Sequence, residues 1–151
     1  MALFKLMHLF SVLIWVGGMF FAYLVLRPAA LEVLEAPQRL RLWDAVLRRF
    51  FNWIWVAVGV LLVSGLYMVY LYGGVTHVPH YVHFMLVSGV AMMAIFGYAF
   101  FARYVPLNLL VAKQRWKDAG EQLVWIRRLV GLNLVLGLLT VCAVKIGMVL
   151  G

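Results

Sequence analysis

Four long stretches of the chain contain almost no charged side chain, and this feature constrains the fold most strongly. They cover approximately residues 3–26, 50–74, 81–103 and 128–150. At a rise of 1.5 Å per residue, about 20 helical residues cross a hydrocarbon core of roughly 30 Å. Unpaired backbone groups in lipid cost several kcal/mol each, so spanning segments of this length are expected to be helical. The sequence therefore predicts an all-α integral membrane four-helix bundle, with residues 1–151 forming a single transmembrane domain.

The composition excludes an ordinary soluble domain. Hydrophobic residues make up 67% of the chain and charged residues 12%, with a mean hydropathy of +1.03. Soluble domains have roughly 45–50% apolar and about 25% charged residues. The lone Cys142 excludes an internal disulfide framework and a multi-thiolate zinc site. Hydrolase and kinase functions find no support, because no nucleophile dyad or phosphate-binding glycine loop is visible.

Basic residues predict how the helices cross the membrane. They gather in the first and third connections, whereas residues 73–80 of the second connection contain none. The positive-inside rule then places both termini and the loop of His77 and His80 on the outer, periplasmic side, with only Lys5 opposed. We expect a multi-pass protein of the bacterial inner membrane. No RNA-binding motif accompanies the basic residues, so no nucleic-acid partner is expected.

The ends of the first span and the two basic connections support further expectations. The first apolar stretch exceeds the ~7–15 residues of a signal-peptide core, and Arg27 followed by Pro28 suits a cleavage site poorly, so we expect this span to be retained. Apolar residues at spacings of three and four in residues 37–50 predict an amphipathic helix, either lying in the headgroups or extending the second span. Residues 108–128 have the same character, with Gly120 as a candidate break.

Metal-ligating residue types converge on the outer leaflet in this topology. Ionisable residues within a bilayer are rare and expensive, so each is a functional hypothesis. Segments far apart in the sequence bring imidazole, thioether and thiol groups to one depth: Met7, His8, Met68, His77, His80, His83, Met85, Cys142 and Met148. This donor set suits copper or haem iron better than magnesium or calcium.

His8 and His83 are the first-choice ligands, because each lies a few residues inside its own span at a comparable depth. His8, Ser11, Trp15 and Gly18 recur at helical spacing and line one face, which makes Trp15 a candidate neighbour of a cofactor. The alternative is structural: the two histidines hydrogen-bond across helices and the glycines allow close packing.

Secondary candidates surround this pair. His80 and His83 share a helical face if both are helical, and His80, Met85 and Met7 are candidate additional ligands. His77 and His80 are also explained as unpatterned loop histidines in the headgroup region. Lys145 either neutralises an anionic group, such as a haem propionate, or extends to the outer headgroups. Three mid-span expectations are structural: hydrogen bonds between helices from Asn133 and Thr140, and core filling by Met92 and Met93.

Several segments resemble the CopD (copper resistance D) family of bacterial inner-membrane proteins. The similarity touches all four spans: His8 followed by Trp15-Val16-Gly17-Gly18-Met19-Phe20-Phe21, then Arg27-Pro28-Ala29, Arg49-Phe50, Ser64-Gly65, Tyr81-Val82-His83 and Ile126-Arg127-Arg128-Leu129-Val130-Gly131-Leu132-Asn133. The resemblance implies copper handling at the inner membrane with membrane His and Met residues as candidate ligands. Larger members have more spans, which makes a homodimer plausible here.

A second resemblance is to HemJ-type proteins, four-span haem b proteins whose first span also carries a histidine followed by a tryptophan, as His8 and Trp15 do here. Two cofactors therefore stay open, copper and haem b. The leading hypothesis is a CopD-like protein that binds copper near the periplasmic leaflet and serves copper transport or tolerance. The alternative is an enzyme, a haem b redox protein with His8 and His83 as axial ligands and quinone or a porphyrin as electron partner. A cofactor-free structural subunit is the third hypothesis.

Overall fold

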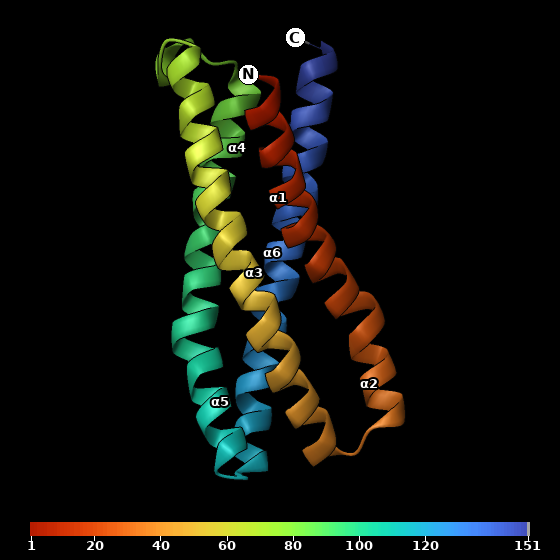
Figure 1. Ribbon diagram of the computed structural model, residues 1–151. Helices are drawn as coiled ribbons and strands as arrows, with labels where there is room; N and C mark the ends of the chain where they lie inside the picture. Colours follow the sequence, from red (N-terminus) through yellow and green to blue (C-terminus); the bar gives the residue numbers. More distant parts are fainter. Residues whose placement is uncertain (151) are drawn as a thin grey trace.

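The structure, a computed structural model, describes residues 1–150, and within these residues the secondary structure is helical. Four continuous helical segments are long and apolar enough to cross a membrane: Ala2–Val33, Ala36–Leu71, His80–Ala112 and Trp116–Leu150. The elements in chain order are α1 (Ala2–Phe20), η1 (Phe21–Leu26), α2 (Arg27–Val33), α3 (Ala36–Leu71), η2 (Val75–His77), α4 (His80–Tyr98), η3 (Ala99–Tyr104), α5 (Val105–Ala112) and α6 (Trp116–Leu150). Figure 1 shows their arrangement as a bundle, which confirms the all-α prediction.

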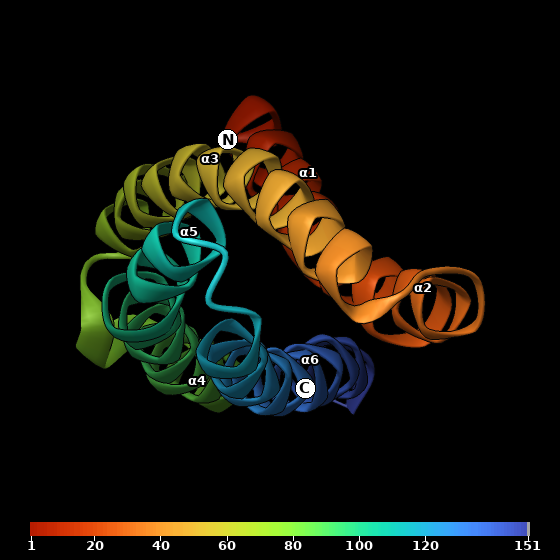
Figure 2. The ribbon, with the colours of Figure 1, turned by 90° about the horizontal axis from the view of Figure 1, so that it is seen from below.

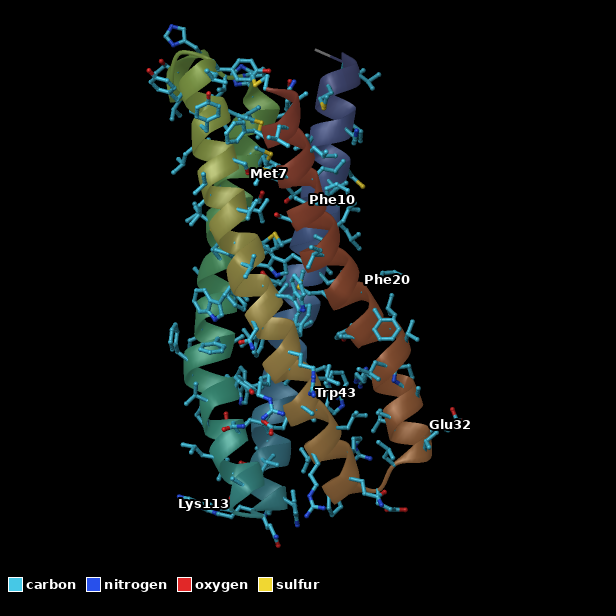
Figure 3. The ribbon with its side chains drawn as sticks, in the orientation of Figure 1. Met7, Phe10, Phe20, Glu32, Trp43 and Lys113 are labelled. Atoms are coloured by element: carbon cyan, nitrogen blue, oxygen red, sulfur yellow. The ribbon has the colours of Figure 1, made fainter. Side chains whose placement is uncertain are left out.

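The four long segments run up and down, so the bundle has two chemically different ends (Figure 1). The N-terminus, the turn of residues 72–79 and the last turns of α6 lie together at one end, which we call the histidine end. The α2–α3 connection at residues 34–35 and the α5–α6 connection at residues 113–115 lie at the opposite, basic end. In Figure 3, Met7 marks the first end, and Glu32 and Lys113 mark the second.

The connections between the helices agree with the sequence-based expectations except at one position. The turn between α3 and α4 uses Gly73 and Gly74 at φ 91° and 103°, a left-handed conformation that other residues rarely adopt. The amphipathic residues of the first connection extend the second span, because α3 begins at Ala36. The predicted break at Gly120 is wrong. One glycine in a helix interior costs only about 1 kcal/mol, and α6 continues through it, while the chain turns before Trp116.

A cluster of aromatic rings joins α3 to the third span. Phe51 of α3 is 1% exposed, and its ring meets those of Phe96, Phe100 and Tyr104 at centroid distances of 5.6, 5.6 and 5.1 Å. The interplanar angles of 62° to 79° are edge-to-face geometries, which aromatic pairs prefer. Trp15 extends the cluster to α1 through an edge contact with Phe96.

Two polar side chains fasten α6 to α4, as predicted for Asn133 and Thr140. Asn133 Nδ2 donates to the Met92 carbonyl oxygen at 3.1 Å. Thr140 Oγ1 lies 2.9 Å from Ser88 Oγ of α4 and 2.7 Å from the Leu136 carbonyl oxygen of its own helix. Met92 is itself buried in the core, which confirms its predicted packing role. Hydrogen bonds of this kind between membrane helices contribute on average about 0.6 kcal/mol each.

Two π-helical segments widen the first and third spans, and each lies just before a proline. In η1 the Arg27 N–H bonds to the Ala22 carbonyl, and in η3 the Val105 N–H bonds to the Phe100 carbonyl, five residues back in both cases. Proline lacks an N–H, and its ring clashes with the carbonyl four residues earlier, so Pro28 and Pro106 favour a wider turn at these places. Beyond η1, α2 diverges from the rest of the bundle (Figure 2).

Candidate metal centre

His8 is held by a small-residue site on α3. Its Nδ1 lies 3.0 Å from Ser64 Oγ, and its Cε1 lies 3.5 Å from the place where a Cβ on Gly65 would be. Ser64 is 1% exposed, so this hydrogen bond is shielded on the serine side. The Ser64–Gly65 pair therefore provides both the hydrogen-bond partner and the space that the imidazole ring needs against α3.

The hydrogen bonds of Ser64 assign the tautomer of His8. The Ser64 hydroxyl lies 2.6 Å from the Val60 carbonyl oxygen, which can only accept, so the single hydroxyl hydrogen is directed there. Ser64 Oγ then accepts from His8 Nδ1–H. This assignment leaves Nε2 of His8 without a proton and with a free lone pair, which is the state in which a histidine nitrogen ligates a metal ion.

His83 has the same tautomer as His8, but a different contact fixes it. Its Nδ1 lies 3.2 Å from the carbonyl oxygen of Pro79, the residue that precedes α4. Because a carbonyl oxygen only accepts, Nδ1 of His83 carries the hydrogen and Nε2 is unprotonated in the neutral ring. His8 and His83 thus share one arrangement: Nδ1 is bonded to the protein, and Nε2 is available.

The remaining candidate ligands lie at the histidine end: Met7 on α1, His77 in the turn, and His80 and Met85 on α4. The rings of His80 and His83 have centroids 6.2 Å apart, a separation at which two imidazoles can approach one ion bound at about 2 Å from each nitrogen. His80 is exposed and Met85 half-buried, and the Met7 side chain is 40% exposed. His77 is exposed in the turn, where its Nδ1 lies 3.1 Å from Thr76 Oγ1.

Trp15 and Lys145 are placed differently from the histidines. Trp15 is buried in the hydrophobic core, one to two turns further along α1 than His8. Lys145 is exposed on the last part of α6. This part of α6 lies beside the start of α4, because a Cβ on Gly147 would fall 2.6 Å from the Cβ of Tyr81. Within residues 1–150, no three His, Cys, Asp or Glu side chains form a group that could hold a metal ion.

Charge separates the two ends of the bundle. All five acidic residues lie towards the basic end: Glu32, Glu35, Asp44, Asp118 and Glu121. At the histidine end, the described residues offer imidazole, thioether and thiol groups but no carboxylate. Oxygen-preferring cations such as magnesium and calcium lack their usual ligands there, whereas soft copper does not.

Ser64 and Gly65 are the functional neighbours that helix periodicity alone misses. The pattern of α1 correctly predicts an inward face containing Ser11 and Trp15, both of which are buried. It does not indicate which residues of another helix face His8. Their signals in the sequence are a small hydroxyl residue beside glycine in the middle of an apolar span and the presence of Ser64-Gly65 among the segments that resemble CopD.

Residues 44–146 match the family model CopD, described as Copper resistance protein D. The chain belongs to the CopD family. The matched region begins in α3 and ends near the C-terminal end of α6, so it contains Ser64, His83 and Lys145 but not His8 or Trp15. Comparison with curated proteins and with solved structures gave no match. CopD membership agrees with a membrane protein related to copper resistance.

Proposed function

We propose that this CopD protein binds Cu(I) at the histidine end of the bundle and serves copper transport or tolerance at the bacterial inner membrane. His8 and His83 are the principal ligands. His80, Met85 and Met7 are additional candidates that would have to move closer on binding, since no three His, Cys, Asp or Glu side chains of residues 1–150 form a group in the structure. The observation that carries the proposal is the matched state of the two imidazoles, whose Nδ1 atoms are bonded to the protein while Nε2 remains available. Such a second contact is typical of metal-ligating histidines.

The donor chemistry supports Cu(I) over other ions. Neutral imidazole and thioether groups are soft ligands that suit a monovalent copper ion. A divalent ion at this end would bring two charges into a site where the described residues include no carboxylate. Trp15 closes the site from the core side, and Lys145 extends towards the headgroups.

The distribution of the basic residues predicts which side of the membrane the histidine end faces. Only Lys5 and Lys145 lie at the histidine end, and the other basic residues lie towards the opposite end: Arg27, Arg39, Arg41, Arg48, Arg49, Arg103, Lys113, Arg115, Lys117, Arg127 and Arg128. The positive-inside rule then orients the histidine end to the periplasm. Copper enters from that side, and a homodimer provides a longer path than four helices alone.

Copper analysis of the purified full chain tests this function. After anaerobic loading with Cu(I) and desalting, we expect about one copper ion per chain. The visible spectrum of the protein extracted from membranes provides the second readout, since Cu(I) has no visible bands while bis-imidazole haem has strong Soret and α bands. Absence of copper after loading, or a stoichiometric haem spectrum, contradicts the proposal.

Ser64 is a positioning residue in this account, and its replacement gives a graded prediction. Ser64→Ala removes the acceptor that fixes the His8 tautomer, so we expect Cu(I) affinity to fall by about tenfold to a hundredfold. Ser64→Thr keeps the hydroxyl and should restore most of the affinity. Ser88→Ala is the control, because Ser88 is similarly buried but bonds to the Met85 carbonyl and Thr140 rather than to histidine. Wild-type affinity in Ser64→Ala contradicts the positioning role.

A further inference from the structure

A cavity of about 610 Å³ lies at the basic end, far from the histidines. It is lined by η1 and α2 on one side, the first half of α3 on another and the first half of α6 on the third. The divergence of α2 after η1 opens this space (Figure 2). Its volume is in the range of roughly 300–1,000 Å³ that is typical of sites for small organic ligands. The cavity is independent of the proposed copper site.

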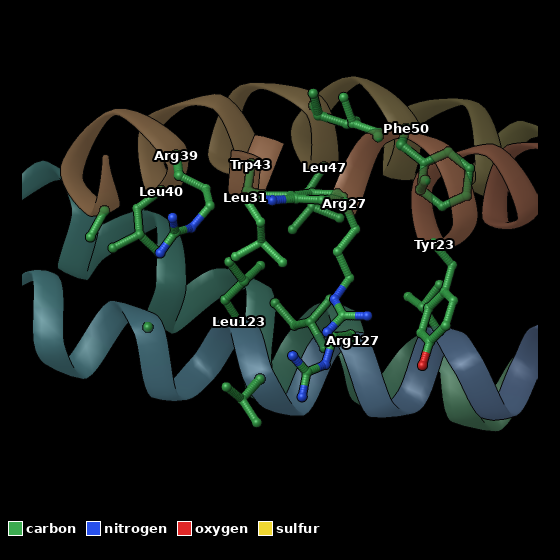
Figure 4. A pocket seen from close by; sticks show the side chains of 18 of the residues that line it. Tyr23, Arg27, Leu31, Arg39, Leu40, Trp43, Leu47, Phe50, Leu123 and Arg127 are labelled. Atoms are coloured by element: carbon green, nitrogen blue, oxygen red, sulfur yellow. The ribbon is translucent and has the colours of Figure 1, made fainter. Parts of the chain in front are cut away.

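The cavity has an apolar interior. Phe50 covers its inner end beside Gly18, where a Cβ would fall 2.5 Å from the Phe50 ring. Leucine and tryptophan side chains from three helices form the walls, including Leu31, Trp43 and Leu123 (Figure 4). Gly120 leaves open space, since a Cβ added there meets nothing within 4 Å. Much of the cavity wall is therefore apolar and can contact an apolar ligand.

Four basic side chains line the same cavity, and no acidic one does. They are Arg27, Arg39, Lys117 and Arg127. Figure 4 shows the side chains of Arg27 and Arg127 extending towards each other between α2 and α6. Within residues 1–150, the only ion pair joins Arg115 to Asp118, outside the cavity. The lining therefore concentrates positive charge without a protein counter-charge, and an anion bound there relieves the repulsion.

The length of the cavity is close to the thickness of one membrane leaflet. From Arg27 back to Gly18 the lining spans nine residues, about 14 Å at the helical rise. Half of a hydrocarbon core is about 15 Å thick. The basic residues lie towards the end of the bundle and the Gly18–Phe50 contact towards its middle. A ligand that fits has an anionic head at the surface and an apolar tail reaching the membrane centre.

We propose that this cavity is a binding site for one anionic phospholipid, with its phosphate between Arg27 and Arg127 and its acyl chains against α3 and α6. Guanidinium groups bind phosphate through paired, charge-assisted hydrogen bonds. Haem fits the cavity less well, because its lining contains no His, Met or Cys to ligate iron. A segment of a second copy would have to carry carboxylates into the membrane, where they are costly.

Lipid binding to the full-length protein in detergent tests the proposal. After delipidation, native mass spectrometry compares phosphatidylglycerol with phosphatidylcholine of the same acyl chains. We expect one phosphatidylglycerol per chain, bound at least tenfold more tightly than phosphatidylcholine and accompanied by a rise in Tm. The double variant Arg27→Gln/Arg127→Gln should lose this preference at least tenfold. Inorganic phosphate alone should leave Tm unchanged, because it lacks the acyl chains.

Two further variants make the test specific. Arg49→Gln/Arg128→Gln removes the same charge from residues outside the lining and should keep the preference for phosphatidylglycerol. Gly120→Leu fills the cavity without changing charge and should weaken phosphatidylglycerol binding, so it carries the test if the double arginine variant does not fold. The proposal is overturned by equal binding of both lipids, by equal loss in the control, or by an effect of phosphate that equals that of lipid.

Discussion

Replacing His8 or His83 by alanine should lower Cu(I) affinity at least a hundredfold, a loss of about 3 kcal/mol. Each substitution removes a proposed Nε2 ligand whose ring is oriented by Ser64 or by the Pro79 carbonyl. In the proposed site the two imidazoles bind one ion, so the double variant should be only slightly worse than either single one. Competition against a coloured Cu(I) chelator measures all three affinities.

His77→Ala is the matched control for these variants. His77 is a histidine of the same end, exposed in the turn beside Thr76, and it is not among the proposed ligands. Its replacement should leave Cu(I) affinity within twofold of the wild type. Equal losses in His77→Ala and His8→Ala would show that the histidines act through general surface binding rather than through one site.

Replacing Phe51 by alanine should destabilise the bundle by about 3 kcal/mol or more, within the range found for buried Phe→Ala substitutions. Phe51 is 1% exposed and meets three rings of the third span. Membrane helices gain little from the hydrophobic effect on association, so the loss arises from the cavity and the missing packing contacts. Unfolding in mixed micelles of increasing denaturing detergent measures the difference.

Trp53→Ala is the control for this prediction. Trp53 lies two residues away on α3, and its side chain is 63% exposed towards the surroundings of the bundle. Its replacement leaves no internal cavity and should change the free energy of unfolding by less than about 1 kcal/mol. A similar loss from both substitutions would contradict the view that the aromatic cluster holds α3 against the third span.

The helices could be predicted from the sequence because lipid leaves few alternatives to long apolar stretches. The apolar spacing before Phe50 predicted an amphipathic helix but left open whether it lies in the headgroups or extends the second span. The structure shows the extension, with Leu40, Trp43 and Leu47 buried in the core. At Gly120, the helix-breaking tendency of glycine is weaker than the packing of the surrounding helix α6. A single glycine does not end a helix that is packed on both sides of it, and the chain turns instead where Gln114 adopts a left-handed conformation.

The sites could be predicted only in part, because they depend on how helices are placed relative to one another. Periodicity predicts the inward face of α1 but not the axial offset that sets His8 beside Ser64. The basic cavity is harder to predict from the sequence pattern than the position of His8. It requires the outward path of α2 after the π turn before Pro28, and the direction of such a bend depends on packing between helices.

X-ray absorption at the copper edge of the Cu(I)-loaded protein measures whether His8 and His83 bind one copper ion. We expect at least two imidazole nitrogens bound to one copper ion in the wild type, and one fewer in both His8→Ala and His83→Ala. A copper environment with fewer than two imidazoles, or one that is unchanged when either histidine is removed, would contradict it.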